Sequence, residues 1–126
     1  MMAIDNTALD SQTRAVTDYY RYVDSGDVGA LVSLFTDEAV YYRPGYPPLQ
    51  GHADLRRFYT EDREIEAGHH KIARIVGADP HVAVYGHFTG VLKNGTAVAV
   101  GFADFFSFAT DGRFAERRTF FETPAV

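Results

Sequence analysis

Apolar residues recur three or four positions apart near the start of the chain, a spacing that predicts a helix over residues 7–24. Ser25-Gly26 interrupts the pattern, and Asp27 is a suitable N-cap for a second, short helix over residues 28–35. The inner face of the first helix would consist of Leu9, Val16, Tyr19, Tyr20 and Val23.

A short run of apolar residues over positions 39–43 predicts a strand, which Pro44-Gly45 ends because proline cannot continue a paired strand. A further apolar face at helical spacing predicts a third helix that begins near residue 52 and ends at Gly68. Its inner side would carry Leu55, Phe58, Tyr59 and Ile65.

Strands are predicted for the rest of the chain. Alternating apolar and polar positions indicate strands over residues 69–76 and 82–92, followed by two long strands within residues 96–122. The sequences KNG at 93–95 and TDG at 110–112 are typical of the tight turns that join antiparallel strands.

This order of elements predicts an α+β fold, in which a cone-shaped, curved antiparallel sheet is wrapped around three amino-terminal helices. Such an arrangement leaves an internal pocket, which is a natural site for a small molecule. We expect residues 1–126 to form a single domain, with residues 1–6 as a loose arm.

The composition favours a pocket with apolar walls. Hydrophobic residues make up 46% of the chain, and the aromatic residues comprise eight Tyr, ten Phe and no Trp. That many rings in 126 residues can fill a core and still line a cavity. The expected ligand is a hydrophobic small molecule.

Charge and motifs exclude several classes of function. The net charge is −5 and no Lys/Arg cluster occurs, so nucleic-acid binding is not expected. Cysteine is absent, which excludes thiolate chemistry. The histidines and carboxylates lack a compact ligand spacing, so we predict no metal, and without a phosphate-binding loop we predict no cofactor. Without an apolar run long enough for a membrane span, we expect a soluble cytoplasmic protein.

Asp104 is the first candidate for chemistry, because it lies in a predicted strand between Phe102 and Phe106, on the same face. A carboxyl group on an apolar face must be protonated, paired or used. It could be a neutral donor to a substrate oxygen, or a structural aspartate paired with Arg43 or Arg117. Arg117 and Arg118 point to opposite faces, so one of them can enter the pocket.

Hydroxyl and imidazole groups supply further candidates. The hydroxyl of Tyr19 or Tyr59 could enter the pocket, although a buried tyrosine often has only a structural partner. His87 is suited to acid–base chemistry, unless it is a core histidine bonded to a tyrosine. His69 and His70 point to opposite faces of a strand, and we favour His70 as the inward one.

Several segments together resemble the bacterial ketosteroid isomerases. They are YYRYVDSGD at 19–27, LFTDEAV at 34–40, PPLQG at 47–51 and ADFFSF at 103–108. The wider group is the nuclear transport factor 2-like superfamily, which includes SnoaL-type polyketide cyclases, scytalone-type dehydratases and limonene-type epoxide hydrolases. The similarity extends from about residue 10 to 122.

The resemblance implies roles for individual residues. Tyr19 and Asp104 fall on the tyrosine and the protonated aspartic acid of the isomerase oxyanion hole, a known example of a carboxyl group that stays neutral at pH 7. Tyr59 falls on a supporting tyrosine. Arg43 stands where the isomerases have the aspartate that moves the proton, and an arginine cannot replace it. The isomerase reaction by that base is therefore not expected.

A second resemblance, to the scytalone-type dehydratases, implies an acid–base site without a carboxylate at position 43. Its two histidines would be His70 and His87, with Asp24 orienting the first. The substrate-holding tyrosine of that group, followed by arginine, is similar to Tyr42-Arg43.

These observations together predict a small cofactor-independent enzyme that uses acid–base chemistry on a hydrophobic oxygenated molecule of steroid, polyketide or terpenoid type, as an isomerase, dehydratase or cyclase. The predicted catalytic residues are Tyr19, Asp104, His87 and Arg43, where Arg43 would either hold an acidic substrate group or neutralise Asp104. The predicted substrate-binding residues are Tyr59, Tyr42, His70, Phe102, Phe106 and Phe121. The alternative is a domain of the same fold that binds a ligand without turnover, or that serves to dimerise. A homodimer is expected, paired through the outer sheet face that includes Ala97, Ala99, Gly101, Ala103 and Phe105.

Overall fold

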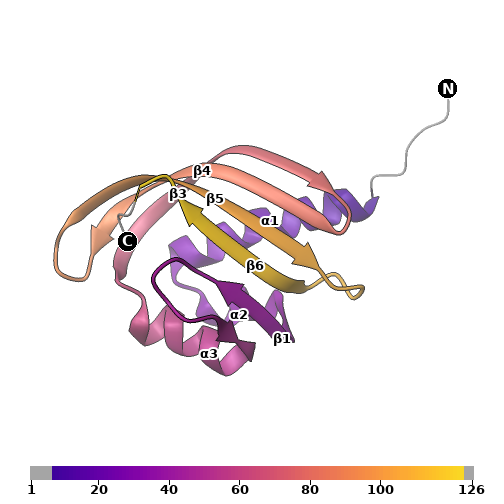
Figure 1. The fold of residues 1–126 in the computed structure, drawn as a ribbon, viewed down its shortest axis with the longest axis horizontal. Helices are drawn as coiled ribbons and strands as arrows, with labels where there is room; N and C mark the ends of the chain where they lie inside the picture. Colours follow the sequence, from indigo (N-terminus) through magenta and orange to yellow (C-terminus); the bar gives the residue numbers. More distant parts are fainter. Residues whose placement is uncertain (1–6, 124–126) are drawn as a thin grey trace.

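The computed structural model describes residues 7–123, and the arm predicted for residues 1–6 lies outside the described residues. Two helices, two strands and a third helix with a helical turn precede the last four strands (Figure 1). In chain order the elements are α1 (Thr7–Ser25), α2 (Val28–Ser33), β1 (Phe35–Tyr42), β2 (Leu49–Gln50), α3 (Gly51–Arg57), the π-helical turn η1 (Phe58–Asp62), β3 (Ile65–Ala78), β4 (His81–Leu92), β5 (Ala97–Phe108) and β6 (Phe114–Phe121).

The strands form one curved, unclosed sheet in the order β2-β1-β6-β5-β4-β3. All neighbouring strands are antiparallel except β1 and β6, which pair in parallel. The β4–β5 hairpin turns at Gly95, whose φ of 87° is accessible to glycine at little cost. The predicted α+β fold with a curved sheet beside amino-terminal helices is thus confirmed.

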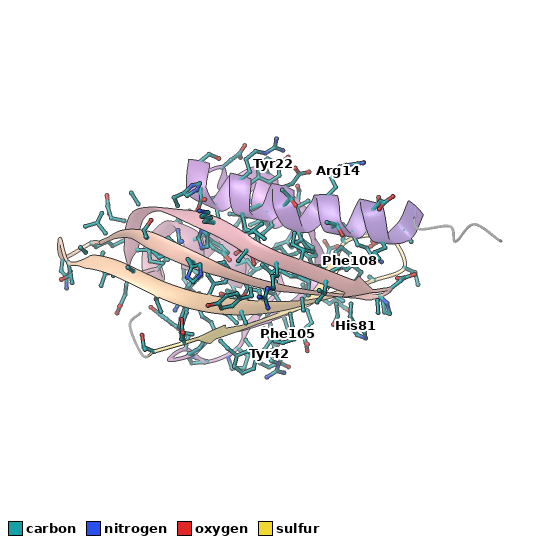
Figure 2. The ribbon with its side chains drawn as sticks, turned by 90° about the horizontal axis from the view of Figure 1, so that it is seen from above. Arg14, Tyr22, Tyr42, His81, Phe105 and Phe108 are labelled. Carbon is teal, nitrogen blue, oxygen red and sulfur yellow. The ribbon has the colours of Figure 1, made fainter. Side chains whose placement is uncertain are left out.

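Helix α1 covers the inner face of the sheet (Figure 2). Arg14 and Tyr22 lie on the side of α1 that faces away from the sheet, whereas Phe105 and Tyr42 lie on the opposite, outer face of the sheet. The core between helix and sheet is almost entirely aromatic and aliphatic. Its fully buried members include Val16, Tyr19, Leu31, Phe35, Leu55, Phe58, Phe106 and Phe114.

The predicted cap of α2 is confirmed, because the Asp27 carboxylate accepts a hydrogen bond of 3.1 Å from the Ala30 N–H. The predicted end of this helix is wrong. Helix α2 stops at Ser33, and Phe35 begins β1, where it pairs with Phe114 of β6. The apolar spacing of Phe35 therefore reflects a buried strand start and not another helical turn.

The third helix is also shorter than predicted. The helical segment ends at Asp62, and Ile65 opens β3 by pairing with Leu92 of β4. Gly68 lies within β3 and does not terminate a helix. A Cβ atom at this position would overlap the Phe88 ring, so the glycine permits Phe88 to pack closely on the strand.

Candidate functional site

A small cavity lies between the helices and the inner face of the sheet, lined by residues from α1, β1, η1, β3, β4, β5 and β6. Its volume of about 30 Å3 has room for about two water molecules, since one needs roughly 10–15 Å3. Tyr59, Arg63 and Phe121 line it and are half-buried, so they form its mouth. A steroid-sized ligand requires these side chains to move.

Asp104 lies beside the cavity and does not line it, because its side chain is completely buried and both carboxylate oxygens are occupied. Oδ2 accepts hydrogen bonds from the Tyr20 hydroxyl and, at 2.8 Å, from Arg117 Nη2. Oδ1 accepts a hydrogen bond from the Thr119 hydroxyl, which in turn lies 3.1 Å from the Tyr41 hydroxyl. The expectation of a neutral donor at this position does not fit the geometry; the alternative, a pair with Arg117, does.

Arg117 connects this buried carboxylate to the two tyrosines of the cavity wall. Its Nη1 donates to the Tyr19 hydroxyl at 2.6 Å and to the Tyr59 hydroxyl at 3.1 Å. The two hydroxyls are also hydrogen-bonded to each other. Tyr19 and Tyr59 therefore share one polar cluster as the resemblance implied, but a guanidinium and not an aspartic acid completes it.

Burial governs the acidity of the hydroxyls around Asp104. It raises the pKa of Tyr19 well above its ordinary value, although the charge of Arg117 opposes the shift. Burial and then the Asp104 carboxylate raise the pKa of Tyr20, and burial raises the pKa of Tyr41 to about 12. Burial alone would lower the pKa of the Arg117 guanidinium, but the charge of Asp104 raises it well above its usual range. The tyrosines are thus neutral hydrogen-bonding groups.

His70 lines the cavity and is held by Asp24, from the last turn of α1. The two Asp24 oxygens accept one hydrogen bond from the His70 backbone N–H, at 2.8 Å, and one from the ring Nδ1, at 2.5 Å. Since a carboxylate only accepts, Nδ1 carries the proton and the lone pair of Nε2 is left for the cavity. Burial lowers the pKa of His70, although its bond to Asp24 opposes this, so the neutral base is favoured near pH 7.

Arg43 follows β1 and is only 8% exposed. Its guanidinium lies 5.1 Å from the centre of the Tyr46 ring, 5.4 Å from Phe58 and 5.2 Å from Phe121. Within residues 7–123 no hydrogen bond or ion pair to its side chain is found, and Nη1 is buried without a partner. The predicted pair between Arg43 and Asp104 is not formed.

Besides Asp104, three predicted site residues do not line the cavity. His87 is exposed on the outer face of β4, where its ring is 5.2 Å from Tyr85, so its predicted place in the pocket is wrong. Tyr42 also faces outward and contacts Arg118. Phe106 is buried in the core against Phe114 and does not line the cavity. Alternation along the strands directs each of the first two side chains outward.

The other predicted residues lie as expected. Tyr19, Tyr59, Arg43, His70, Phe102 and Phe121 all line the cavity. The sequence alone assigns no functional role to Tyr20, Tyr41 or Thr119, and it does not decide whether Arg117 or Arg118 faces the pocket. Along β6, alternate residues share a face, so Arg117, Thr119 and Phe121 form one set and Arg118 and Phe120 the other. The sequence does not show which of the two sets faces inward.

Among residues 7–123 no group of three or more histidine, cysteine or carboxylate side chains is placed to hold a metal ion. None of the helices that the described chain forms is long and apolar enough to cross a membrane.

The fold and its enclosed, partly polar cavity define a member of the nuclear transport factor 2-like superfamily. The family model for the SnoaL-like domain matches residues 16–117, and the chain belongs to this family. A comparison with curated proteins found no match.

Solved structures share the fold at low sequence identity. SalBIII, an epoxide hydrolase/cyclase-like enzyme with a role in pyran ring formation in the polyether salinomycin, is 23% identical over 90% of this chain and 92% of its own, with a TM-score of 0.79. An M. tuberculosis LEH-like epoxide hydrolase is 18% identical over 90% of this chain and 84% of its own, with a TM-score of 0.77. A Catenulispora acidiphila protein with a ketosteroid isomerase-like fold, in complex with trimethylamine, is 20% identical over 84% of this chain and 83% of its own, with a TM-score of 0.75.

Proposed function

We propose that the chain is a small cofactor-independent enzyme that moves a proton on an oxygenated small molecule, as an isomerase, dehydratase or cyclase. The observation that carries the proposal is the Asp24–His70 pair, because Asp24 occupies Nδ1 and the ring lines a cavity that hydroxyl groups also line. A positioned histidine base typically contributes roughly 10²–10⁴-fold to the rate of a proton transfer.

In the proposed reaction, Nε2 of His70 takes a proton from a carbon next to a substrate carbonyl. The electron pair of the broken C–H bond moves into the carbonyl, whose oxygen becomes an enolate. The imidazolium formed on His70 is stabilised by the Asp24 carboxylate at 2.5 Å. If a double bond is conjugated with the enolate, return of the proton to the far carbon of that double bond gives isomerisation. If the β-carbon carries a hydroxyl group, the enolate expels it as it takes the proton, which gives dehydration.

The hydrogen bonds around Arg117 suggest which group stabilises the enolate oxygen. Arg117 can only donate hydrogen bonds, so the Tyr19 oxygen accepts one from it. The Tyr19 hydroxyl can then donate its own hydrogen bond to the Tyr59 oxygen. The Tyr59 proton is left for the substrate oxygen. The positive charge of Arg117 polarises the two hydroxyl groups. It thereby strengthens the hydrogen bond from Tyr59 as negative charge develops on the enolate oxygen.

The comparisons support the class of reaction and not its substrate. The SnoaL-like family and the cyclase-like and epoxide hydrolase-like neighbours are consistent with acid–base work on oxygenated compounds. Binding of a ligand without turnover is the second candidate, because the carboxylate base of the isomerases is replaced by Arg43.

The test exploits two adjacent histidines. The side chain of His70 is 10% exposed and faces the cavity, whereas that of His69 is 75% exposed. Exchange of the carbon-bound hydrogens of cyclohexanone and of 4-oxopentanoate for deuterium is followed by NMR in heavy water. We expect wild type and His69→Gln to catalyse exchange of at least one ketone, and His70→Gln to lose about 100-fold or more.

Equal rates in His70→Gln and wild type would show that His70 is not the base. Tight binding of either ketone by the wild type, with no exchange above the buffer rate, would favour the binding protein.

A further inference from the structure

The cavity is lined by positive charge and by no carboxylate. Arg43, Arg63 and Arg117 reach it from three different segments, together with His70. The residues that line it include no Asp or Glu, although the chain has 17 acidic residues against 12 Lys and Arg. The ionised side chains that line the cavity are therefore all cationic, although the whole protein is acidic.

Arg117 shows how a structural arginine is accommodated in this interior. It is 5% exposed, and its charge is matched by Asp104 at 2.8 Å, while Nη1 is used by Tyr19 and Tyr59. Arg117 accordingly needs no ligand to neutralise it.

Within the part of the chain that the structure describes, Arg43 differs from Arg117 in the absence of a counter-charge. It is buried to the same degree, but no carboxylate pairs with it among residues 7–123. The rings of Tyr46, Phe58 and Phe121 offer their faces, which attract a cation but provide neither a counter-charge nor an acceptor in the plane of the guanidinium. A buried cation without a partner costs free energy that an anionic ligand would recover.

We infer that the substrate is a carboxylate, whose acid group binds to Arg43. The planar fork of a guanidinium matches the two oxygens of a carboxylate. Five apolar side chains (Val23, Ile65, Phe88, Phe102 and Phe121) also line the cavity and suit a short hydrocarbon body attached to the acid group. The inference rests on the proposed function only in calling the ligand a substrate, because the site itself follows from Arg43.

The experiment compares acids with their neutral esters. Acetate, butanoate, hexanoate, benzoate and 4-oxopentanoate, their methyl esters, and inorganic phosphate are titrated into the protein at low ionic strength, and binding is measured by calorimetry and NMR. The variants are Arg43→Met, which retains length and apolar contact, Arg43→Lys, which retains charge without the fork, and Arg14→Met, an exposed control on α1.

We expect at least one acid to bind the wild type and Arg14→Met 10-fold or more tightly than its ester. Arg43→Met loses this preference, and Arg43→Lys retains part of it. The inference is overturned if no acid binds, if esters bind as tightly as acids, or if Arg43→Met keeps the preference. If Arg43→Met does not give the circular dichroism spectrum of the wild type, the test rests on Arg43→Lys. A lower affinity of this variant for the acids then supports the inference, and an unchanged affinity overturns it.

The two proposals fail in different ways. Acid binding that depends on Arg43, without any exchange that depends on His70, would refute the enzyme and leave the anion site. Exchange of cyclohexanone that depends on His70, without any preference for acids, would refute the anion site and leave the enzyme.

Discussion

Substitution of Arg117 by methionine would test whether the pair with Asp104 is a buried structural unit. The change removes the guanidinium bonded to a carboxylate that is 0% exposed, and within the described part of the chain leaves Asp104 with the hydroxyls of Tyr20 and Thr119. Loss of one partner of a buried ion pair typically costs about 3–5 kcal/mol. For a domain of this length that corresponds to a fall in Tm of roughly 10–20 °C.

Arg43→Met is the matched comparison, because Arg43 is 8% exposed and Arg117 is 5% exposed. Here no buried carboxylate is left behind, and the methionine can pack against Phe58 and Phe121. The loss of cation–π contacts, about 0.5–2 kcal/mol, opposes the relief of an unpaired buried charge. We therefore expect the free energy of unfolding either to fall by less than about 1 kcal/mol or to rise.

Both variants are measured by urea unfolding, followed by far-ultraviolet circular dichroism, with the slope against urea checked for two-state behaviour. The double variant Asp104→Asn/Arg117→Met should be destabilised by less than the sum of the two single variants, since they act on one pair. Equal destabilisation by Arg43→Met and Arg117→Met would refute the reasoning, because Arg43 would then have a structural partner as strong as Asp104.

Two further predictions concern pH and assembly. Burial lowers the pKa of His70 from its ordinary value of 6.5, so the unfolded chain binds the proton more readily; stability should be complete above about pH 6.5 and should fall below it. Thermal unfolding between pH 5 and 8 should show a shallower slope for His70→Gln, and equal slopes would contradict the assignment. Phe105 and Phe120 are each 50% exposed, and their rings pack together 5.9 Å apart on the outer sheet face. We expect two chains to pair through this face, so Phe105→Glu should yield monomers in sedimentation velocity, whereas a monomeric wild type would rule the pairing out.

The local pattern of the sequence is sufficient to predict most of the elements. Apolar spacing finds α1 within one residue of its observed end, and turn chemistry finds both hairpins of β4, β5 and β6. The errors at Phe35 and Ile65 have one cause. A single apolar residue next to a helix satisfies the helical period and the start of a strand equally well, and only strand pairing decides between them.

The candidate site could be predicted only in part, because its roles depend on partners distant in sequence. The position of Asp104 is evident from its strand, but its ionic partner depends on the pairing of β5 with β6. His87 shows the opposite case. Val84 and Phe88 on the same strand are buried, so alternation alone would have directed His87 outward, and the resemblance to dehydratases suggested otherwise.

The parallel pairing of β1 with β6 has a consequence for the order of assembly. Arg117 and Tyr19, which are bonded to each other, are 98 positions apart in the chain, and β6 inserts between β1 and β5. Asp104 and Arg117 are only 13 positions apart on the neighbouring strands β5 and β6, but Arg117 reaches Tyr19 only when this hairpin packs against α1. Burial of either charge before the two strands pair would be costly, so closure of the core before β6 is in place is disfavoured.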